Sequence, residues 1–300
     1  MKNYLFVTIV MLCSVSMAAY AHASRGGIPL CEGLSSSENQ HAHDLVHEAV
    51  ELIGLKGEEA FKDFSVRGSQ WFRGDDYIFV HAMDGTLVCN PAFPDMIGDQ
   101  MIDFKDVTGK PFIRFMRDQV TEFGRDSGWV HYLWPVPGEV EPRWKSSYVH
   151  RAVTPGGTSY YVGTGHYSVP MEKCFAIQQV KDAVQLIRKS GPQSFDIVRS
   201  RSGPFVWKKT YVLVIGTDGM IYVNPAQPGN ENMNMLNFLA ADGSAPVKRF
   251  IELLEKQESG WVTYSWPKPG SLEPSTKHTY LELVRFDGVE YMVGCGLYLD

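Results

Sequence analysis

Two blocks of the sequence combine aromatic side chains with a lysine in a pattern suited to binding a small anion. In the first block, Tyr132 and Trp134 alternate along a predicted strand and therefore share one of its faces. Lys145 and Tyr148 begin the next predicted strand, after a turn that brings them near Trp134. Ligand pockets are mostly apolar with a few placed polar groups, and an ammonium group suits a carboxylate or an amino acid. The second block repeats the pattern with Tyr264, Trp266, Lys277 and Tyr280.

The aromatic residues of these blocks could instead form the core of a sheet, because aromatic side chains dominate protein cores. Lys145 and Lys277 fit that alternative less well, since a lysine is seldom buried without a partner. His81 is a further ligand-binding candidate, because the second half of the sequence has Ile215 at the corresponding position and a residue that differs could determine ligand choice. Arg114, on a predicted helix, could clamp an anion or face solvent, which is the commoner location for arginine.

The sequence carries no motif of a catalytic or metal site. It has no phosphate-binding glycine loop with Lys-Ser/Thr, no G-x-S-x-G nucleophile elbow and no H-E-x-x-H pair. His43 and His47 would share a helix face and could hold a divalent ion, but the sequence fixes no acidic or cysteine partner for them. We therefore expect His41, His43 and His47 to be solvated histidines at the start of a helix, and we expect neither an enzyme, a metal nor a cofactor.

Composition limits the class of protein. Of the 300 residues, 44% are hydrophobic and 12% aromatic, which is typical of a globular chain. The formal charge of −6 leaves no basic surplus to hold a polyanion, so nucleic acid is not an expected partner. At ~150 residues per domain, the length predicts about two domains.

An internal repeat accounts for most of that length. Residues 128–148 and 260–280 are identical at 12 of 21 positions without a gap. Shorter blocks recur in the same order upstream and downstream, which indicates a tandem duplication. These are Asp84-Gly85, Asn90-Pro91 and Gly163-x-Gly165-x-Tyr167, matched by Asp218-Gly219, Asn224-Pro225 and Gly294-x-Gly296-x-Tyr298.

Each copy predicts the same elements in the order helix–β–β–helix–β–β–β. Apolar residues spaced three and four apart predict the helices, and an Asp-Gly turn between β-rich segments predicts a hairpin. The fold class is therefore α+β, with a five-stranded antiparallel sheet flanked by helices in each copy. The expected strands are 77–83, 87–90, 129–134, 146–153 and 160–166, then 211–215, 220–224, 261–266, 278–285 and 290–297.

The N-terminus reads as an export signal. Lys2 precedes an apolar segment that ends at Ala21-His22-Ala23, a small-x-small cleavage site. We expect a signal peptide at 1–23, a lead at 24–40, a first domain at 41–167, a linker at 168–174 and a second domain at 175–300. The location would be the periplasm; the alternative is a protein anchored in the membrane by an uncleaved N-terminal segment.

Four cysteines would remain after cleavage. In an oxidising compartment they permit two disulfides. Cys31 and Cys174 each precede a predicted helix and could pair, whereas Cys89 and Cys295 lie in strands and could equally be buried thiols.

Each copy resembles the bacterial extracytoplasmic Cache sensor domain, in its single-Cache type 2 form. The resemblance covers about residues 41–167 and 175–298 and implies a PAS-like fold that binds small carboxylates or amino acids. It implies ligand contacts for the Tyr, Trp, Lys and Tyr of each block. The first copy carries it in Tyr77-x-Phe79-Val80, Asp84-Gly85, Asn90-Pro91, Asp106-x-x-Gly109-Lys110, Gly128-Trp129-Val130-x-Tyr132-x-Trp134, Pro137-Gly138, Lys145-x-x-Tyr148 and Gly163-x-Gly165-x-Tyr167.

Two features depart from the family. Asn90 and Asn224 stand where the family usually has a histidine before the proline. Most relatives are receptors with a membrane helix and an output module, whereas this chain reaches Asp300 without a second apolar span. We therefore expect a periplasmic tandem-Cache sensor that passes its signal through a separate membrane-bound sensor or transporter. The alternative is a protein-interaction or assembly module with non-functional pockets.

Overall fold

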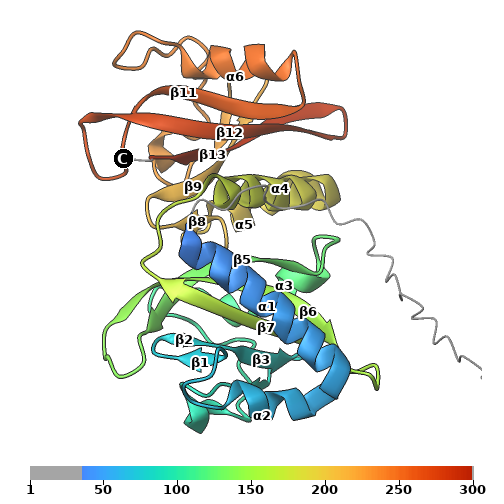
Figure 1. The fold of residues 1–300 in the computed structure, drawn as a ribbon. Helices are drawn as coiled ribbons and strands as arrows, with labels where there is room; N and C mark the ends of the chain where they lie inside the picture. Colours follow the sequence, from blue (N-terminus) through green and yellow to red (C-terminus); the bar gives the residue numbers. More distant parts are fainter. Residues whose placement is uncertain (1–35, 299–300) are drawn as a thin grey trace, which may run out of the picture.

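Two antiparallel β-sheets with the same strand order form the centre of the protein (Figure 1). The structure is a computed structural model that describes residues 36–298. The first sheet has the order β4-β3-β7-β6-β5 and the second the order β10-β9-β13-β12-β11. Each sheet therefore contains the five antiparallel strands that the sequence predicts for each copy.

The strands lie close to their predicted positions. In the first sheet they are β3 (Phe79–Ala82), β4 (Leu87–Cys89), β5 (Ser127–Pro135), β6 (Pro142–Val153) and β7 (Ser159–Tyr167). In the second sheet they are β9 (Thr210–Gly216), β10 (Ile221–Val223), β11 (Ser259–Pro267), β12 (Pro274–Phe286) and β13 (Val289–Leu297). The sequence does not predict the two-residue strands β1 (Phe72–Arg73), β2 (Asp76–Tyr77) and β8 (Val206–Trp207), which are too short for a periodic signal.

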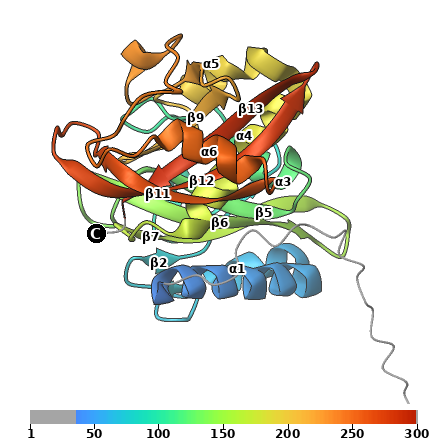
Figure 2. The same cartoon turned by 90° about the horizontal axis from the view of Figure 1, so that it is seen from above.

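Helices cover both faces of each sheet. On the first sheet α1 (Ser37–Lys56) lies against one face, as seen from above in Figure 2, and α3 (Phe112–Thr121) against the other. On the second sheet the corresponding helices are α4 (Lys173–Ser190) and α6 (Pro246–Leu254). Figure 1 shows α4 between the two sheets. The short helices α2 (Ala60–Phe64) and α5 (Phe195–Arg199) follow α1 and α4.

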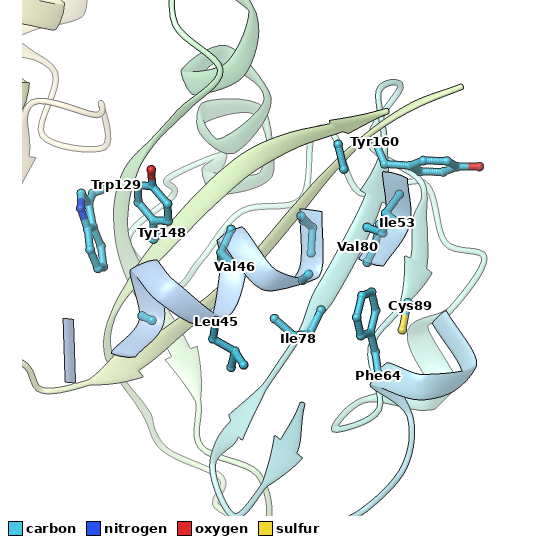
Figure 3. Close-up of a cluster of buried hydrophobic side chains, with 14 of the residues drawn as sticks. Leu45, Val46, Ile53, Phe64, Ile78, Val80, Cys89, Trp129, Tyr148 and Tyr160 are labelled. Atoms are coloured by element: carbon cyan, nitrogen blue, oxygen red, sulfur yellow. The ribbon is translucent and has the colours of Figure 1, made fainter. Parts of the chain in front are cut away.

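The apolar stripe of α1 illustrates why the helices take these positions. Leu45, Val46 and Ile53 are buried, and Figure 3 shows them facing Ile78 and Val80 at the first sheet. Their spacing of one, seven and eight residues places them on one side of the helix. The helix therefore buries a single face, and its other side meets solvent.

Two helices begin earlier than the predicted domain boundaries. The helix α1 starts at Ser37, within the predicted lead, because the Ser36 Oγ accepts a hydrogen bond from the Asn39 backbone N–H at 3.3 Å and caps it. Glu172 accepts a hydrogen bond from the Ser36 backbone N–H at 3.2 Å. The helix α4 starts at Lys173, within the predicted linker 168–174.

Several terminal predictions lie outside the described residues. These are the signal peptide, its cleavage site and Cys31. Between residues 36 and 298, no helix is both long enough and apolar enough to cross a membrane. Cys89 and Cys295 are buried free thiols, as one of the two alternatives expects, and Cys174 is buried on α4.

Candidate functional site

The second half contains a partly open cavity of about 50 Å³ between its sheet and α6. Alternate residues of β9, Tyr211, Leu213 and Ile215, line it because side chains two apart on a strand share a face. Val247 and Phe250, one helical turn apart on α6, close it from the other side. Three predicted site residues also line this cavity: Tyr264, Trp266 and Lys277.

Lys277 is the only charged side chain in the lining of this cavity among the described residues. It is 1% exposed, and its Nζ donates a hydrogen bond to the Tyr211 hydroxyl at 3.0 Å. The Nζ also lies 4.5 Å from the centre of the Tyr211 ring and 5.5 Å from that of Tyr298. Such ring contacts stabilise a cation, but they leave its formal charge without a counter-ion.

A glycine lies directly against the Lys277 side chain. A Cβ at Gly296 of β13 would overlap with the Lys277 Cε. In the second half, the second glycine of the Gly-x-Gly motif therefore leaves space for the Lys277 side chain on the surface of the sheet. At the corresponding Gly165 of the first half, a Cβ would instead meet the backbone of Ser146 and Ser147.

The corresponding cavity of the first half is smaller, at about 20 Å³. The candidate residues His81, Tyr132 and Trp134 line it, but neighbouring aromatic rings fill most of the space. Phe112 of α3 stacks on Tyr132 with ring centres 4.1 Å apart. The His81 ring stacks on Tyr161 at 5.1 Å. Burial lowers the pKa of His81 to about 4, so its ring is neutral at pH 7.

Lys145 does not reach the cavity of the first half. It is fully buried, and its Nζ has no hydrogen-bond acceptor within the part of the chain that the structure describes. The Nζ lies 3.9 Å from the Tyr77 ring centre and 4.8 Å from that of Tyr167. Burial lowers its pKa to about 7, although Asp76 and Asp75 act in the opposite direction.

Replacing Lys145 with methionine is expected to stabilise the protein by about 1–4 kcal/mol at pH 6. At that pH both the folded and the unfolded chain hold the proton, and the folded state bears the full cost of burying the ammonium. As the pH rises from about 7 towards the ordinary value of 10.5, the folded state releases its proton first. The cost then disappears, so the stability of the parent rises with pH and the advantage of the variant shrinks.

Urea unfolding of parent and variant at pH 6 and pH 9.5 measures this difference. Lys105→Met is the matched control, because it removes the same charge at an exposed position. A Lys145→Met protein that is less stable than its parent at pH 6 would show that the ammonium contributes favourably to the fold.

Besides Lys145, three predicted site residues lie away from the two cavities. Tyr148 pairs with Trp129 across β5 and β6 and faces α1, as Figure 3 shows, so it does not line the cavity of its half. Tyr280 likewise pairs with Trp261 on the α4 face of the second sheet. The reason is the strand period, since residues three apart, such as Lys145 and Tyr148, point to opposite faces. Arg114 forms an ion pair with Asp103 at the surface.

No sequence motif marked Tyr211 as a site residue, although its hydroxyl accepts the hydrogen bond of the Lys277 ammonium. Its counterpart is Tyr77, which stands beside Lys145. A signal was available, because both tyrosines begin the predicted hairpin of their copy. Asn90 and Asn224, which depart from the family pattern, each line the cavity of their own half.

The histidines of α1 are not fully solvated, contrary to expectation. His43 and His47 are half-buried, with ring centres 4.4 Å apart, and His47 lies 4.9 Å from His150. Burial lowers the pKa of His47 to about 4, with a smaller contribution from His150. Across residues 36–298, no three His, Cys, Asp or Glu side chains are grouped so that they could hold a metal ion.

Several known proteins are similar to parts of the chain. The methyl-accepting chemotaxis protein McpP of Pseudomonas putida is 33% identical over 78 residues, which are 26% of this chain and only 14% of McpP. Among solved structures, a Cache chemosensory domain described for carboxylic acid recognition is 23% identical, with a TM-score of 0.36, over 42% of this chain and 91% of that one.

A periplasmic sensor domain of a chemotaxis protein is 26% identical, with a TM-score of 0.37, over 44% of this chain and 95% of that one. The family model dCache_2, described as a Cache domain, matches residues 40–300. This match extends over both sheets and both cavities. The chain therefore belongs to the Cache domain family.

Proposed function

We propose that this chain is a periplasmic sensor protein that binds a small carboxylate in the cavity of its second half. The observation that carries the proposal is the buried Lys277 ammonium, which faces an aromatic cavity with no acidic side chain in the described lining. A buried cation without a counter-ion is costly, and an anionic ligand would remove that cost. The ligand carboxylate would accept hydrogen bonds from Lys277 and Tyr211.

The size and lining of the cavity narrow the ligand class. About one water-sized sphere occupies 10–15 Å³ of such volume. A cavity of about 50 Å³ therefore suits a ligand of roughly three to five non-hydrogen atoms, such as acetate or propionate. An amino acid would also bring an ammonium group, which the described lining offers no carboxylate to receive. We therefore favour a monocarboxylate over an amino acid.

The proposal includes two Cache units in tandem, within residues 41–167 and 175–300, of which the second binds the ligand. The sequence repeat and the shared strand order of the two sheets support it. The family also supports a role without catalysis, in which the liganded protein contacts a separate membrane-bound sensor or transporter. McpP is named as a methyl-accepting chemotaxis protein, which supports the same kind of partner.

Isothermal titration with propionate, acetate and L-alanine tests the ligand assignment. We expect propionate to bind, and Lys277→Met to weaken its binding by about tenfold or more, because a charge-assisted hydrogen bond is lost. Lys145→Met is the matched control in the first half and is expected to leave the affinity within about twofold.

Two results would contradict the proposal. One is the absence of binding for all three compounds, and the other is equal loss of affinity in both lysine variants. If neither lysine affects capture of a co-purifying protein, the alternative of an interaction module with non-functional pockets is favoured.

A further inference from the structure

A larger cleft lies where the two halves meet. It has a volume of about 500 Å³, within the range of small-molecule sites. Trp144 of β6 contributes from the first half, and Met171 comes from the segment between β7 and α4. Lys208, Lys209, Thr210, Lys268 and Tyr298 complete the described lining from the second half.

Lysines are frequent in the described lining of this cleft. Three of its lining side chains are lysines, and none of those that the structure describes is acidic. The Lys208 Nζ donates one hydrogen bond, to the Val169 carbonyl at 2.9 Å, and an ammonium has three donors. Trp144 and Tyr298 provide aromatic wall between the charges. A cleft lined by cations and aromatic rings attracts anions that also carry apolar surface.

The hairpin that presents two of these lysines is strained. Lys208 and Lys209 form the two-residue turn between β8 and β9, because Trp207 pairs with Thr210. Lys208 has a φ of 51°, in the left-handed region where a residue with a Cβ costs about 1–2 kcal/mol. Strain of this kind is concentrated at functional sites, where the side chain itself is needed.

The first half has the same turn without the strain or the positive charge. There Arg73 pairs with Asp76, so Gly74 and Asp75 occupy the two turn positions. Gly74 adopts the positive φ, of 62°, at no steric cost. The second half therefore has two lysines where the first half has a glycine and an aspartate. Of these two turns, the one with the lysines lines the junction cleft.

The walls of the cleft are held in place from both halves. The Lys110 Nζ of the first half donates a hydrogen bond to the Val206 carbonyl of β8 at 2.9 Å and lies 5.8 Å from the Trp144 ring centre. The Tyr298 hydroxyl donates to the Pro267 carbonyl at 2.7 Å, directly before Lys268. The cleft is thus a formed site in the described structure and is distinct from the Lys277 cavity.

From this geometry we propose that the junction cleft binds a small organic anion with two or more negative groups on an apolar body. Lys208 and Lys209 would receive the carboxylate or phosphate groups, while Trp144 and Tyr298 would contact the body. Because residues of both halves contribute, such a ligand would bridge them. Its binding would be independent of the monocarboxylate proposed for the second cavity.

Isothermal titration with three probes tests the proposal on the full protein. Benzene-1,3,5-tricarboxylate has several charges on an apolar ring, benzoate has the ring with one charge, and pyrophosphate has charges without a ring. We expect the tricarboxylate to bind at least about tenfold more tightly than either of the others. Equal binding of benzoate or of pyrophosphate would overturn the proposal, because charge number or the aromatic walls would then be irrelevant.

The Lys208→Gly/Lys209→Gln variant locates the site. It relieves the strained backbone, so its thermal stability is expected to match or exceed that of the parent, while its affinity for the tricarboxylate falls by about tenfold or more. Lys248→Gln/Lys256→Gln removes the same charge from exposed positions at α6 and is expected to change the affinity less than about twofold. Equal losses of affinity in both double variants would show that only net charge matters, which would contradict a binding site in the cleft. Lys277→Met should bind the tricarboxylate normally, which separates this test from that of the proposed function.

Discussion

Replacing Asp182 with leucine is expected to lower the free energy of unfolding by about 3–5 kcal/mol. Asp182, on α4, forms an ion pair with Arg125 at 2.6 Å, and their side chains are only 6% and 10% exposed. Removing the acid leaves the guanidinium buried beside an apolar side chain and without its counter-ion. Urea unfolding at pH 7 measures the loss.

The effect is large because Asp182 belongs to a network that joins the two halves. The Gln119 side chain of α3 donates to Asp182 at 3.2 Å and accepts a hydrogen bond from Gln178 at 3.0 Å. Gln178 also bonds both the backbone N–H and the carbonyl of Trp129 on β5, at 2.9 and 2.8 Å. The α4 helix is thus fixed to the first sheet by polar contacts that have few alternatives in the interior.

A double variant distinguishes the cost of an unpaired charge from the value of the pair. Arg125→Met/Asp182→Leu removes both charges and is expected to recover most of the stability that Asp182→Leu loses, since apolar pairs often replace buried ion pairs at little cost. If the double variant were as unstable as the single one, the loss would come from packing or from the glutamines. A single variant within about 1 kcal/mol of the parent would refute the prediction.

Replacing Trp207 with alanine is expected to cost about 3–5 kcal/mol, the usual range for a buried aromatic residue. Trp207, on β8, is completely buried and stacks on the His131 ring with centres 3.8 Å apart. It also meets Phe175 edge-on at 5.6 Å. These contacts join the first sheet to the second half, so their loss opens a cavity at the junction. Thermal unfolding measured by calorimetry gives the cost.

The histidine provides a second readout of the same change. Burial, with smaller contributions from Lys110 and Lys208, holds the pKa of His131 well below its ordinary value of 6.5. In Trp207→Ala, water reaches the ring and the pKa is expected to rise towards 6.5, which an NMR titration of the His131 ring protons detects.

Trp207→Phe is the matched control for both readouts. It keeps an aromatic ring against His131 and removes an indole N–H that has no hydrogen-bond partner in the described structure. We expect it to cost less than half as much as alanine and to leave the His131 pKa low. An alanine variant as stable as the phenylalanine variant would show that the junction tolerates the cavity.

Local patterns are sufficient to predict most of the secondary structure. The Asp-Gly turns at 84–85 and 218–219 predict hairpins, because positive φ is a requirement of the backbone itself. Gly85 has a φ of 96° and Gly219 one of 89°, and both connect strands of the same sheet. The resemblance to Cache sensors likewise depends on ordered motifs along the chain, and the family match over residues 40–300 confirms the Cache family.

The residues that line each cavity were harder to predict, because the lining depends on which face of the sheet a side chain takes and on which residues pack against it. Strand alternation places Tyr132 and Trp134 correctly beside one cavity, but Tyr148 is an odd number of residues from Lys145 and lies against α1. Arg114 forms an ion pair with a loop residue, Asp103, whose position the sequence does not predict. The motif residues are thus divided between two faces of each sheet.

The repeated motifs, the order and type of the main elements and the membership of the family could all be read from the sequence. The differences between the two halves became visible in the folded chain. Lys145 and Lys277 occupy the same motif position, yet one contacts Tyr77 away from a filled cavity and the other lines an open one. The junction cleft also exists only in three dimensions, since Trp144 and Lys268 are far apart in the chain. The physical reason is that turns and periods depend on a few adjacent residues, whereas cavity volume and desolvation depend on side chains that meet only after the chain has folded.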